Sequence, residues 1–222
     1  MKKGIEEEGC RTVEAIDARL VAYRKLAELG NAFGQFCLGS LYTNGLGVAI
    51  DDVEAVKWYR LSAAQGYAHA QCSLGCAYEN GAGVSVDKVE SVKWYKKAAA
   101  QDFPSAQLSM GYAYMHGCGV AVNKVEAVKW YRRAAAQGDA KSQFNLGNAY
   151  HTGEGVSVDK VESVKWYRKA ADQGHAEAQF YIGIAYIDGE GVYVDNVEGL
   201  KWMKLSAKNG HKDAIKYLKS IE

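Results

Sequence analysis

The chain has 222 residues, of which 48% are hydrophobic and 24% are charged, and this composition is typical of a folded protein rather than a disordered one. Its formal net charge of +1 argues against binding nucleic acid or an anionic membrane through a global electrostatic field. No stretch approaches the roughly 18 apolar residues of a membrane span, and the acidic run soon after Met1 is unlike a signal peptide. We therefore expect a cytoplasmic protein, or a periplasmic or secreted one if a signal peptide has been removed.

The sequence repeats itself with a period of 36 residues. A fixed period of this length is the signature of stacked supersecondary units. All five tryptophans share one column of the repeat alignment, namely Trp58, Trp94, Trp130, Trp166 and Trp202. In chain order we expect an N-terminal segment with a capping helix (1–30), five repeats (31–66, 67–102, 103–138, 139–174 and 175–210) and a C-terminal closing helix (211–222).

Each repeat is predicted to begin with a first helix, followed by a glycine loop. In the second repeat Leu74 and Tyr78 lie four residues apart, which places both side chains on one helical face. Gly75 beside Leu74 lets a partner helix approach closely, and this outweighs its propensity cost of about 1 kcal/mol. The loop carries two glycines, Gly81 and Gly83, where positive φ is predicted.

A second helix is predicted to follow the loop. The valine pair before it, Val84 and Val86 in the second repeat, is expected to be buried. Asp87 and Glu90 match the Asp version of a capping box, in which both side chains accept hydrogen bonds from free backbone N–H groups. The helix is expected to bury Trp94 and its apolar neighbours and, in most repeats, to end at a glycine that suits a left-handed C′ residue.

One such helix pair cannot bury its own apolar face, whereas stacked pairs can. The sequence therefore predicts an all-α protein, a right-handed alpha-alpha superhelix of the tetratricopeptide-like solenoid type. Arg19 to Gly30 aligns with a second helix and His211 to Leu218 with a first helix, so both ends of the array are expected to be closed by a half-repeat.

The repeat resembles the Sel-1-like repeat family, relatives of tetratricopeptide repeats with a longer loop. The resemblance covers about four-fifths of the chain and implies an adaptor that holds other proteins, as family members do in signalling, quality control and bacterial host interaction. Some bacterial members carry disulfides between the two helices of a unit, and this chain departs from that pattern. The matching residues of the second repeat are Ala70-Gln71, Leu74-Gly75, Tyr78, Gly81, Gly83-Val84, Asp87, Lys93-Trp94-Tyr95 and Ala98-Ala99.

The two helices of a repeat have diverged to different extents. The segments Val84 to Tyr95 and Val156 to Tyr167 are identical, including positions that packing does not dictate. The first helices of the same two repeats, Tyr67 to Asn80 and Asp139 to Thr152, agree at only six of fourteen positions, all of them packing positions. We infer that surface positions of the first helices were diversified, or released from constraint, while the second helices stayed uniform.

In tetratricopeptide-like stacking the first helices line a concave groove, which we call the first-helix surface. It is rich in aromatic and aliphatic groups, which often mark protein contacts, and a helix or an extended peptide is the expected ligand. An alternative is that Phe36, Leu108, Phe144 and Phe180 only pack between neighbouring first helices. The candidate binding residues are Phe33, Phe36, Ser40, His69, Cys76, Glu79, Tyr112, Met115, His116, Phe144, Asn148, His151, Phe180, Ile184 and Ile187.

The sequence also bears on three other functions. His69, Cys72 and Cys76 have a helical spacing that could present them to a metal together with His116 or Cys118, but the spacing matches no established motif. No catalytic constellation, P-loop or dinucleotide fingerprint is present, so neither an enzyme nor a cofactor is expected. An immunity protein that neutralises a toxin is an alternative form of partner binding.

Overall fold

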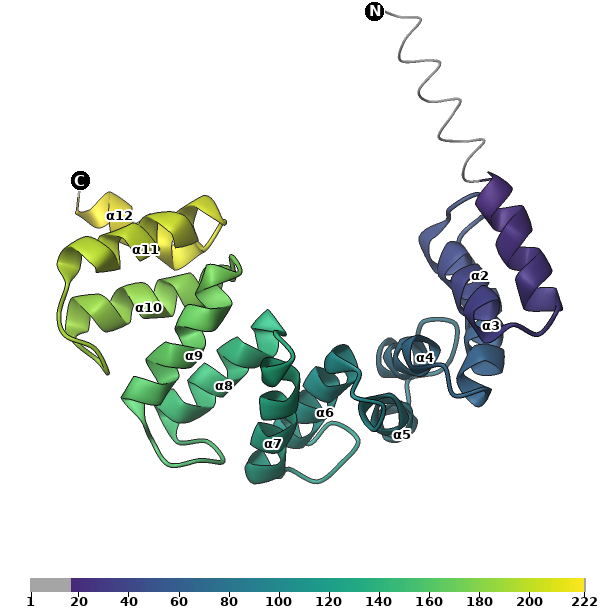
Figure 1. Ribbon diagram of the computed structural model, residues 1–222, viewed down its shortest axis with the longest axis horizontal. Coiled ribbons are helices and arrows are strands. Elements are labelled where there is room, and N and C mark those ends of the chain that lie inside the picture. The colour runs from purple at the N-terminus through teal and green to yellow at the C-terminus, as the bar shows by residue number, and fades with distance from the viewer. Residues whose placement is uncertain (1–16, 222) are drawn as a thin grey trace, which may run out of the picture. The chain divides into compact units, whose positions relative to one another are not determined.

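The computed structural model describes residues 17–221, and every regular element in that range is a helix (Figure 1). Residues 17–28 form the helix that precedes α2. The further helices are α2 (Ala32–Asn44), α3 (Asp52–Ala64), α4 (Ala68–Asn80), α5 (Lys88–Ala99), α6 (Pro104–His116), α7 (Lys124–Ala136), α8 (Ala140–Thr152), α9 (Lys160–Asp172), α10 (Ala176–Asp188), α11 (Asn196–Lys208) and α12 (Lys212–Ser220).

The chain divides into two compact units, the first ending at Ala106 and the second beginning at Gln107 within α6. In the first unit α2 packs on α3, α3 on α4, and α4 on α5. In the second unit the same succession links α7 to α8 and continues through to α12. Because neighbouring helices pack in chain order within each unit, the predicted solenoid of helix pairs is confirmed.

The core of each repeat is built around one large side chain of the first helix. Leu38, Leu74, Met110, Leu146 and Ile182 occupy this position and are almost completely buried. The predicted close approach of the second helix at the next residue is also confirmed. A Cβ added to Gly75 would lie 2.7 Å from the Tyr95 ring, and one added to Gly147 would lie 2.6 Å from the Tyr167 ring.

The glycine loops adopt the predicted left-handed conformation. Gly81 has φ +77° and Gly83 has φ +69°, and their counterparts in the other repeats are similar. Asp102 stands where the other repeats carry the glycine that ends the second helix, and it too has positive φ, of 58°. A short polar residue can adopt this conformation at moderate cost, so the third repeat still starts in register.

The capping box forms only in part. The Asp51 carboxylate accepts a hydrogen bond from the Glu54 backbone N–H at 2.9 Å, and the other second helices start in the same way. The prediction of a reciprocal bond from the Asp51 N–H to the Glu54 carboxylate is wrong, because the Asp51 N–H already donates to the Tyr42 carbonyl oxygen at 3.1 Å. The Glu54 carboxylate therefore turns to Lys57, 2.7 Å away.

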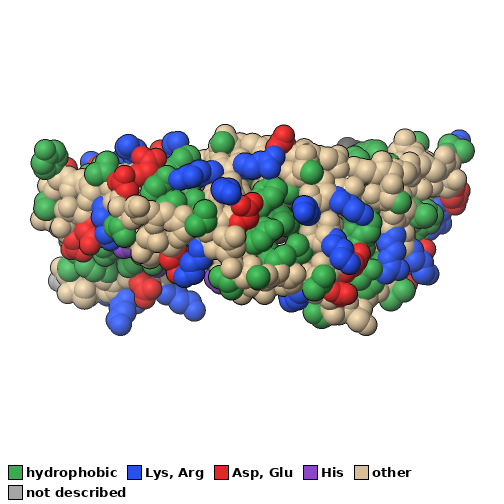
Figure 2. All heavy atoms as spheres, turned by 90° about the horizontal axis from the view of Figure 1, so that it is seen from below, with side chains coloured by type: hydrophobic (Ala, Val, Ile, Leu, Met, Phe, Trp, Pro, Cys, Tyr) green, Lys and Arg blue, Asp and Glu red, His purple; other side chains and the backbone are tan. Residues whose placement is uncertain are grey.

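This glutamate–lysine pair recurs in all five second helices. Each pair is exposed and contributes only a few tenths of a kcal/mol. Its main consequence is that opposite charges alternate on the surface. On the face shown in Figure 2, basic and acidic side chains are interspersed with apolar ones, in keeping with the small net charge.

The expected burial of the valine pair and of the tryptophans needs correction. Val84 is half-buried, but Val86 is 59% exposed, and its side chain lies beside Gly81 in the loop. Trp202 is buried, whereas the other four tryptophans are half-buried at the flank of their helices. Basic side chains lie over three of these rings; for example, the Lys97 ammonium is 3.8 Å from the centroid of Trp94.

Candidate functional site on the first helices

In the first unit the candidate residues form a partly exposed aromatic row. Phe33 is 47% exposed, and His69 is exposed as well. Phe36 is half-buried, with its ring centroid 5.3 Å from that of Tyr67 and 5.6 Å from that of His69. The His69 ring in turn lies 4.6 Å from Phe103. The row thus combines exposed aromatic side chains with half-buried rings that stabilise the stacking of the helix pairs.

Three polar candidates are held by the tyrosine of a second helix. The Tyr95 hydroxyl donates to the Glu79 carboxylate at 2.8 Å, and the Tyr167 hydroxyl donates to the Asn148 side-chain oxygen at 2.6 Å. In the first repeat the Tyr59 hydroxyl lies 3.4 Å from the Ser40 hydroxyl. Burial raises the pKa of Tyr95 and Tyr167, so both phenols stay protonated. Three second helices, α3, α5 and α9, therefore each fix one polar group of the first-helix surface.

In the second unit the most accessible candidates are a pair on α6. Tyr112 is 48% exposed and His116 is exposed, with their ring centroids 4.3 Å apart. Met115, expected on the same surface, is half-buried against the core around Val128 and Leu146. Leu108 packs on the same core. Both therefore contribute more to packing than to an exposed surface.

An aromatic cluster joins α8, α9 and α10. The Phe144 ring is half-buried and lies 4.8 Å from His175 and 5.8 Å from Tyr181. The sequence interpretation missed Tyr181, which is 38% exposed and stacks on Tyr167 at 5.4 Å. Its signal was present in the alignment, because the same column holds only small or polar residues in the other repeats: Cys37, Ser73, Ser109 and Asn145.

Three further candidates, Phe180, Ile184 and Ile187, belong to the fifth repeat and are half-buried. Phe180 stacks on His211 of the closing half-repeat at 4.5 Å. The Ile187 side chain fills the space beside Gly199 of α11. Ile184 lines a small cavity together with Tyr167 and Tyr181. The alternative of packing between first helices therefore describes Phe36, Leu108, Phe144 and Phe180 well.

A charged group lies beside the aromatic cluster. The Lys160 ammonium lies 3.0 Å from an imidazole nitrogen of His151 and 3.2 Å from the Glu190 carboxylate. Burial lowers the pKa of His151, and Lys160 lowers it further against the opposing effect of Glu190. Burial likewise lowers the pKa of His175, whose ring nitrogen accepts from the Ala178 N–H at 3.3 Å. Both imidazoles therefore favour the neutral form.

These lowered pKa values predict a loss of stability in mild acid. Below the usual histidine pKa, near 6.5, the unfolded chain binds more protons than the folded one. The free energy of unfolding should therefore fall as the pH drops through about 6.5 and should level off below the folded pKa values. Urea titrations between pH 7.5 and 5 should show a smaller decline for His151→Gln/His175→Asn, in which asparagine keeps the helix cap. An equal decline in the variant would contradict the assignment.

The metal alternative rests on His69, Cys72 and Cys76. Within residues 17–221 no three His, Cys, Asp or Glu side chains come together in a way that could hold a metal ion. The His69 ring packs between Phe36 and Phe103. Burial raises the pKa of the Cys72 thiol to about 12, so this thiol stays protonated when no metal is bound.

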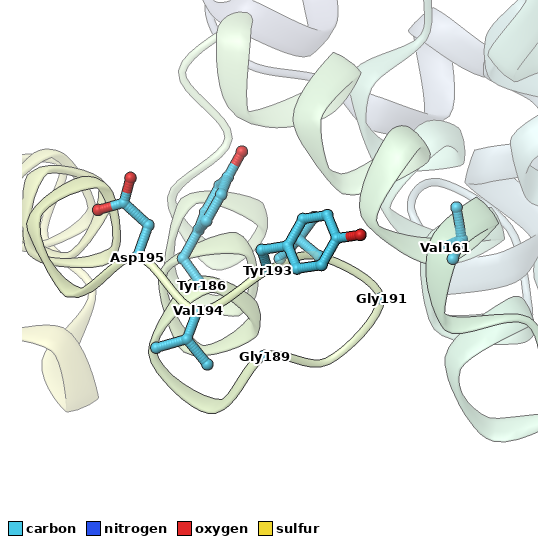
Figure 3. Close-up of a pocket in the computed structure, with 8 residues that line it drawn as sticks. Val161, Tyr186, Gly189, Gly191, Tyr193, Val194 and Asp195 are labelled. Atoms are coloured by element: carbon cyan, nitrogen blue, oxygen red, sulfur yellow. The ribbon is translucent and has the colours of Figure 1, made fainter.

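A second surface feature lies on the loop between α10 and α11. Tyr193 is 97% exposed and borders an open hollow of about 830 Å³ that Val161 and Tyr186 also line. Figure 3 shows the Tyr193 ring on the α9 side of this loop, in the direction of Val161. The corresponding positions of the other repeats hold alanine or serine, so Tyr193 distinguishes the fifth repeat.

Helix pairs of constant length that stack in chain order define the class of this protein, an α-solenoid repeat protein. A model of the Sel1 repeat matches residues 32–67, 68–103, 104–139, 140–175 and 176–211. The chain belongs to the Sel1 repeat family. Proteins of this family are generally protein-interaction scaffolds, and the fold is typically non-enzymatic. No described helix is long and apolar enough to cross a membrane.

Solved structures with the Sel1 repeat fold are also similar to this chain. The chain is 37% identical to a Sel1 repeat protein from Oxalobacter formigenes, with a TM-score of 0.82 over 91% of this chain and 87% of that one. It is also 37% identical to c5321, a protective antigen of uropathogenic Escherichia coli, with a TM-score of 0.84 over 90% of this chain, and it spans 43% of that protein. The immunity protein Pa5087 from Pseudomonas aeruginosa is 19% identical, with a TM-score of 0.57 over 90% of this chain and 83% of that one. The comparison with curated proteins found no match.

Proposed function

We propose that this chain is an adaptor that binds a partner protein or peptide through the first-helix surface. The observation that carries the proposal is the uneven divergence of the repeats. Val84 to Tyr95 and Val156 to Tyr167 are identical, while the first helices beside them differ at every position outside the packing columns. Scaffold constraints alone act on both helices of a pair, so the diversity of one helix points to its ligand.

The chemistry of the exposed candidates supports this function. Phe33, His69, Tyr112 and His116 present ring edges to solvent. Aromatic side chains with a polar edge contribute much of the binding energy at protein interfaces and lose little conformational entropy when they bind. Polar groups such as Glu79 and Asn148 are already oriented by tyrosine hydroxyls, so fewer side chains need to be ordered when a partner arrives.

Partner capture from a lysate of the source cells tests the proposal. Tyr112→Glu/His116→Glu should reduce capture at least about tenfold, because two exposed rings are replaced by charges. The melting temperature should change by only a few degrees, because both side chains are exposed. Tyr193→Glu is the matched control, since this exposed tyrosine lies on the loop between α10 and α11 and not on a first helix. Equal capture by all three proteins would refute the proposal.

Immunity against a toxin is a special case of the same function. The Pseudomonas aeruginosa immunity protein shares the fold at 19% identity, and that similarity shows the fold alone. Identification of the captured partner by mass spectrometry separates the two cases. A toxic enzyme whose activity this chain abolishes would establish immunity, and any other specific partner would establish a general adaptor.

A further inference from the structure

A cavity of about 170 Å³ lies between α2, α3 and α4 in the first unit. Its walls are mostly apolar, and Ala55, Val56, Tyr59 and Ala77 are the buried residues among them. An engineered protein cavity of about 150 Å³ is known to hold benzene. The cavity is therefore large enough for one extended side chain, and it opens beside Cys76, which is a candidate residue of the first-helix surface.

The same positions three repeats further along the chain enclose almost no free space. There, between α8, α9 and α10, the cavity has a volume of about 20 Å³. The cause is a set of substitutions to larger side chains. Thr43, Asp52, Ser73, Cys76 and Ala82 of the first unit correspond to His151, Lys160, Tyr181, Ile184 and Glu190 of the second. The shared scaffold thus carries one open and one filled version of the cavity.

The two versions also differ in charge. In the second unit a lysine of one repeat pairs with a glutamate of the next at this junction, Lys124 with Glu154 at 2.6 Å and Lys160 with Glu190 at 3.2 Å. The first unit has Asp52 in place of the lysine and Ala82 in place of the glutamate. The carboxylate of Asp52 has no hydrogen bond or ion pair with any residue from 17 to 221. The cavity of the first unit therefore lacks the cation that Lys160 supplies at the same place in the second unit.

Three of the other polar side chains that line the cavity, those of Thr43, Tyr59 and Asn80, already have hydrogen-bond partners. The Thr43 hydroxyl donates to the Gly39 carbonyl and lies 3.0 Å from the Tyr59 hydroxyl. The Asn80 amide donates to the Cys76 carbonyl at 3.0 Å. Asp52 is the one charged residue among those that line the cavity, and no cationic side chain lines the cavity with it.

Helix capping does not explain Asp52. An acidic residue in the first turn of a helix is mildly stabilising. However, Asp51 and Glu54 already supply negative charge at the start of α3. The same first position is Lys88, Lys124, Lys160 or Asn196 in the other repeats, whose helices start equally well.

We propose that this cavity takes a lysine or arginine side chain of the bound partner. The aliphatic stem would lie against Ala55, Val56 and Ala77, and the cationic end would meet Asp52. Long basic side chains suit such a site because their stem is apolar and their head is charged. The inference rests on the proposed function, since it assigns one anchor of the partner.

The test uses single blocked amino acids as probes, with the full chain followed by ¹H–¹⁵N NMR. N-acetyl-lysine N-methylamide and its arginine counterpart should shift the resonances of α2, α3 and α4 around Asp52. At least one of them should bind roughly fivefold more tightly than N-acetyl-norleucine N-methylamide, which has the stem without the charge. Asp52→Asn should reduce the binding of the basic probe to the norleucine level.

Two further variants complete the design. Ser73→Tyr/Cys76→Ile should abolish the binding of every probe, because it fills the cavity with the side chains that the second unit already accommodates. The reciprocal Tyr181→Ser/Ile184→Cys should gain no affinity for the basic probes, because Lys160 stands in place of Asp52 there.

Equal binding of norleucine and the basic probes would overturn the proposal, as would shifts that persist in the filled variant or the absence of any shift. The proposed function is judged separately by partner capture. Capture that depends on Tyr112 and His116 while the probes fail would remove only this anchor. Probe binding without such dependence would remove the α6 surface and leave the cavity.

Discussion

Replacing Tyr167 with alanine should lower the free energy of unfolding by about 3–5 kcal/mol, the range for removing a large aromatic side chain from a core. Tyr167 is 2% exposed. Its ring covers Gly147 of α8 and contacts Phe144 and Tyr181, with centroids 5.8 and 5.4 Å away. The truncation therefore leaves a void where the first and second helices of the fourth repeat meet.

Tyr167→Phe separates packing from hydrogen bonding in the same position. It keeps the ring and removes only the hydroxyl that donates to Asn148 at 2.6 Å, so it should cost about 1 kcal/mol. Urea denaturation of both variants, followed by circular dichroism, measures the two effects. If the phenylalanine variant were as unstable as the alanine variant, the ring contacts would not be the source of the stability.

Gly155→Ala should destabilise the protein by about 2–5 kcal/mol, through overpacking and a left-handed backbone that L-residues disfavour. A Cβ at Gly155 would lie 2.1 Å from the Lys124 carbonyl oxygen at the start of α7. Backbone atoms cannot rotate away from such a clash, so the junction between the third and fourth repeats must open. The residue also has φ +76°.

Gly174→Ala is the matched control for this junction. Gly174 has φ +86°, but a Cβ there would meet no atom within 4 Å. Its replacement should therefore cost only the conformational part, about 1–2 kcal/mol. Comparable losses in the two variants, measured by the same denaturation, would show that repeat contact at the loop contributes little.

The candidate site could be predicted from the sequence only in part. Tyr112 and His116 were expected on the first-helix surface, and both are exposed. Met115 was expected beside them, but it packs on the core of the next helix pair. Helical spacing assigns a side chain to a face of its own helix, but it does not say how far the neighbouring helix covers that face. Tyr181 was missed for the same reason.

The sequence by itself determined the local features of this protein. The 36-residue period can be read directly from the order of the residues, and it is present as expected. The N-cap at Asp51 and the left-handed glycines each depend on a few consecutive residues, and they are also present as expected. The tertiary structure alone decided which partner each side chain takes. Glu54 turns to Lys57 because the carbonyl of Tyr42 already holds the amide that a capping box would use.

The open cavity also belongs to the tertiary structure, since residues of two repeats and three helices enclose it. Its volume depends on the sum of several side chains that are distant in sequence, and no local pattern reports such a sum.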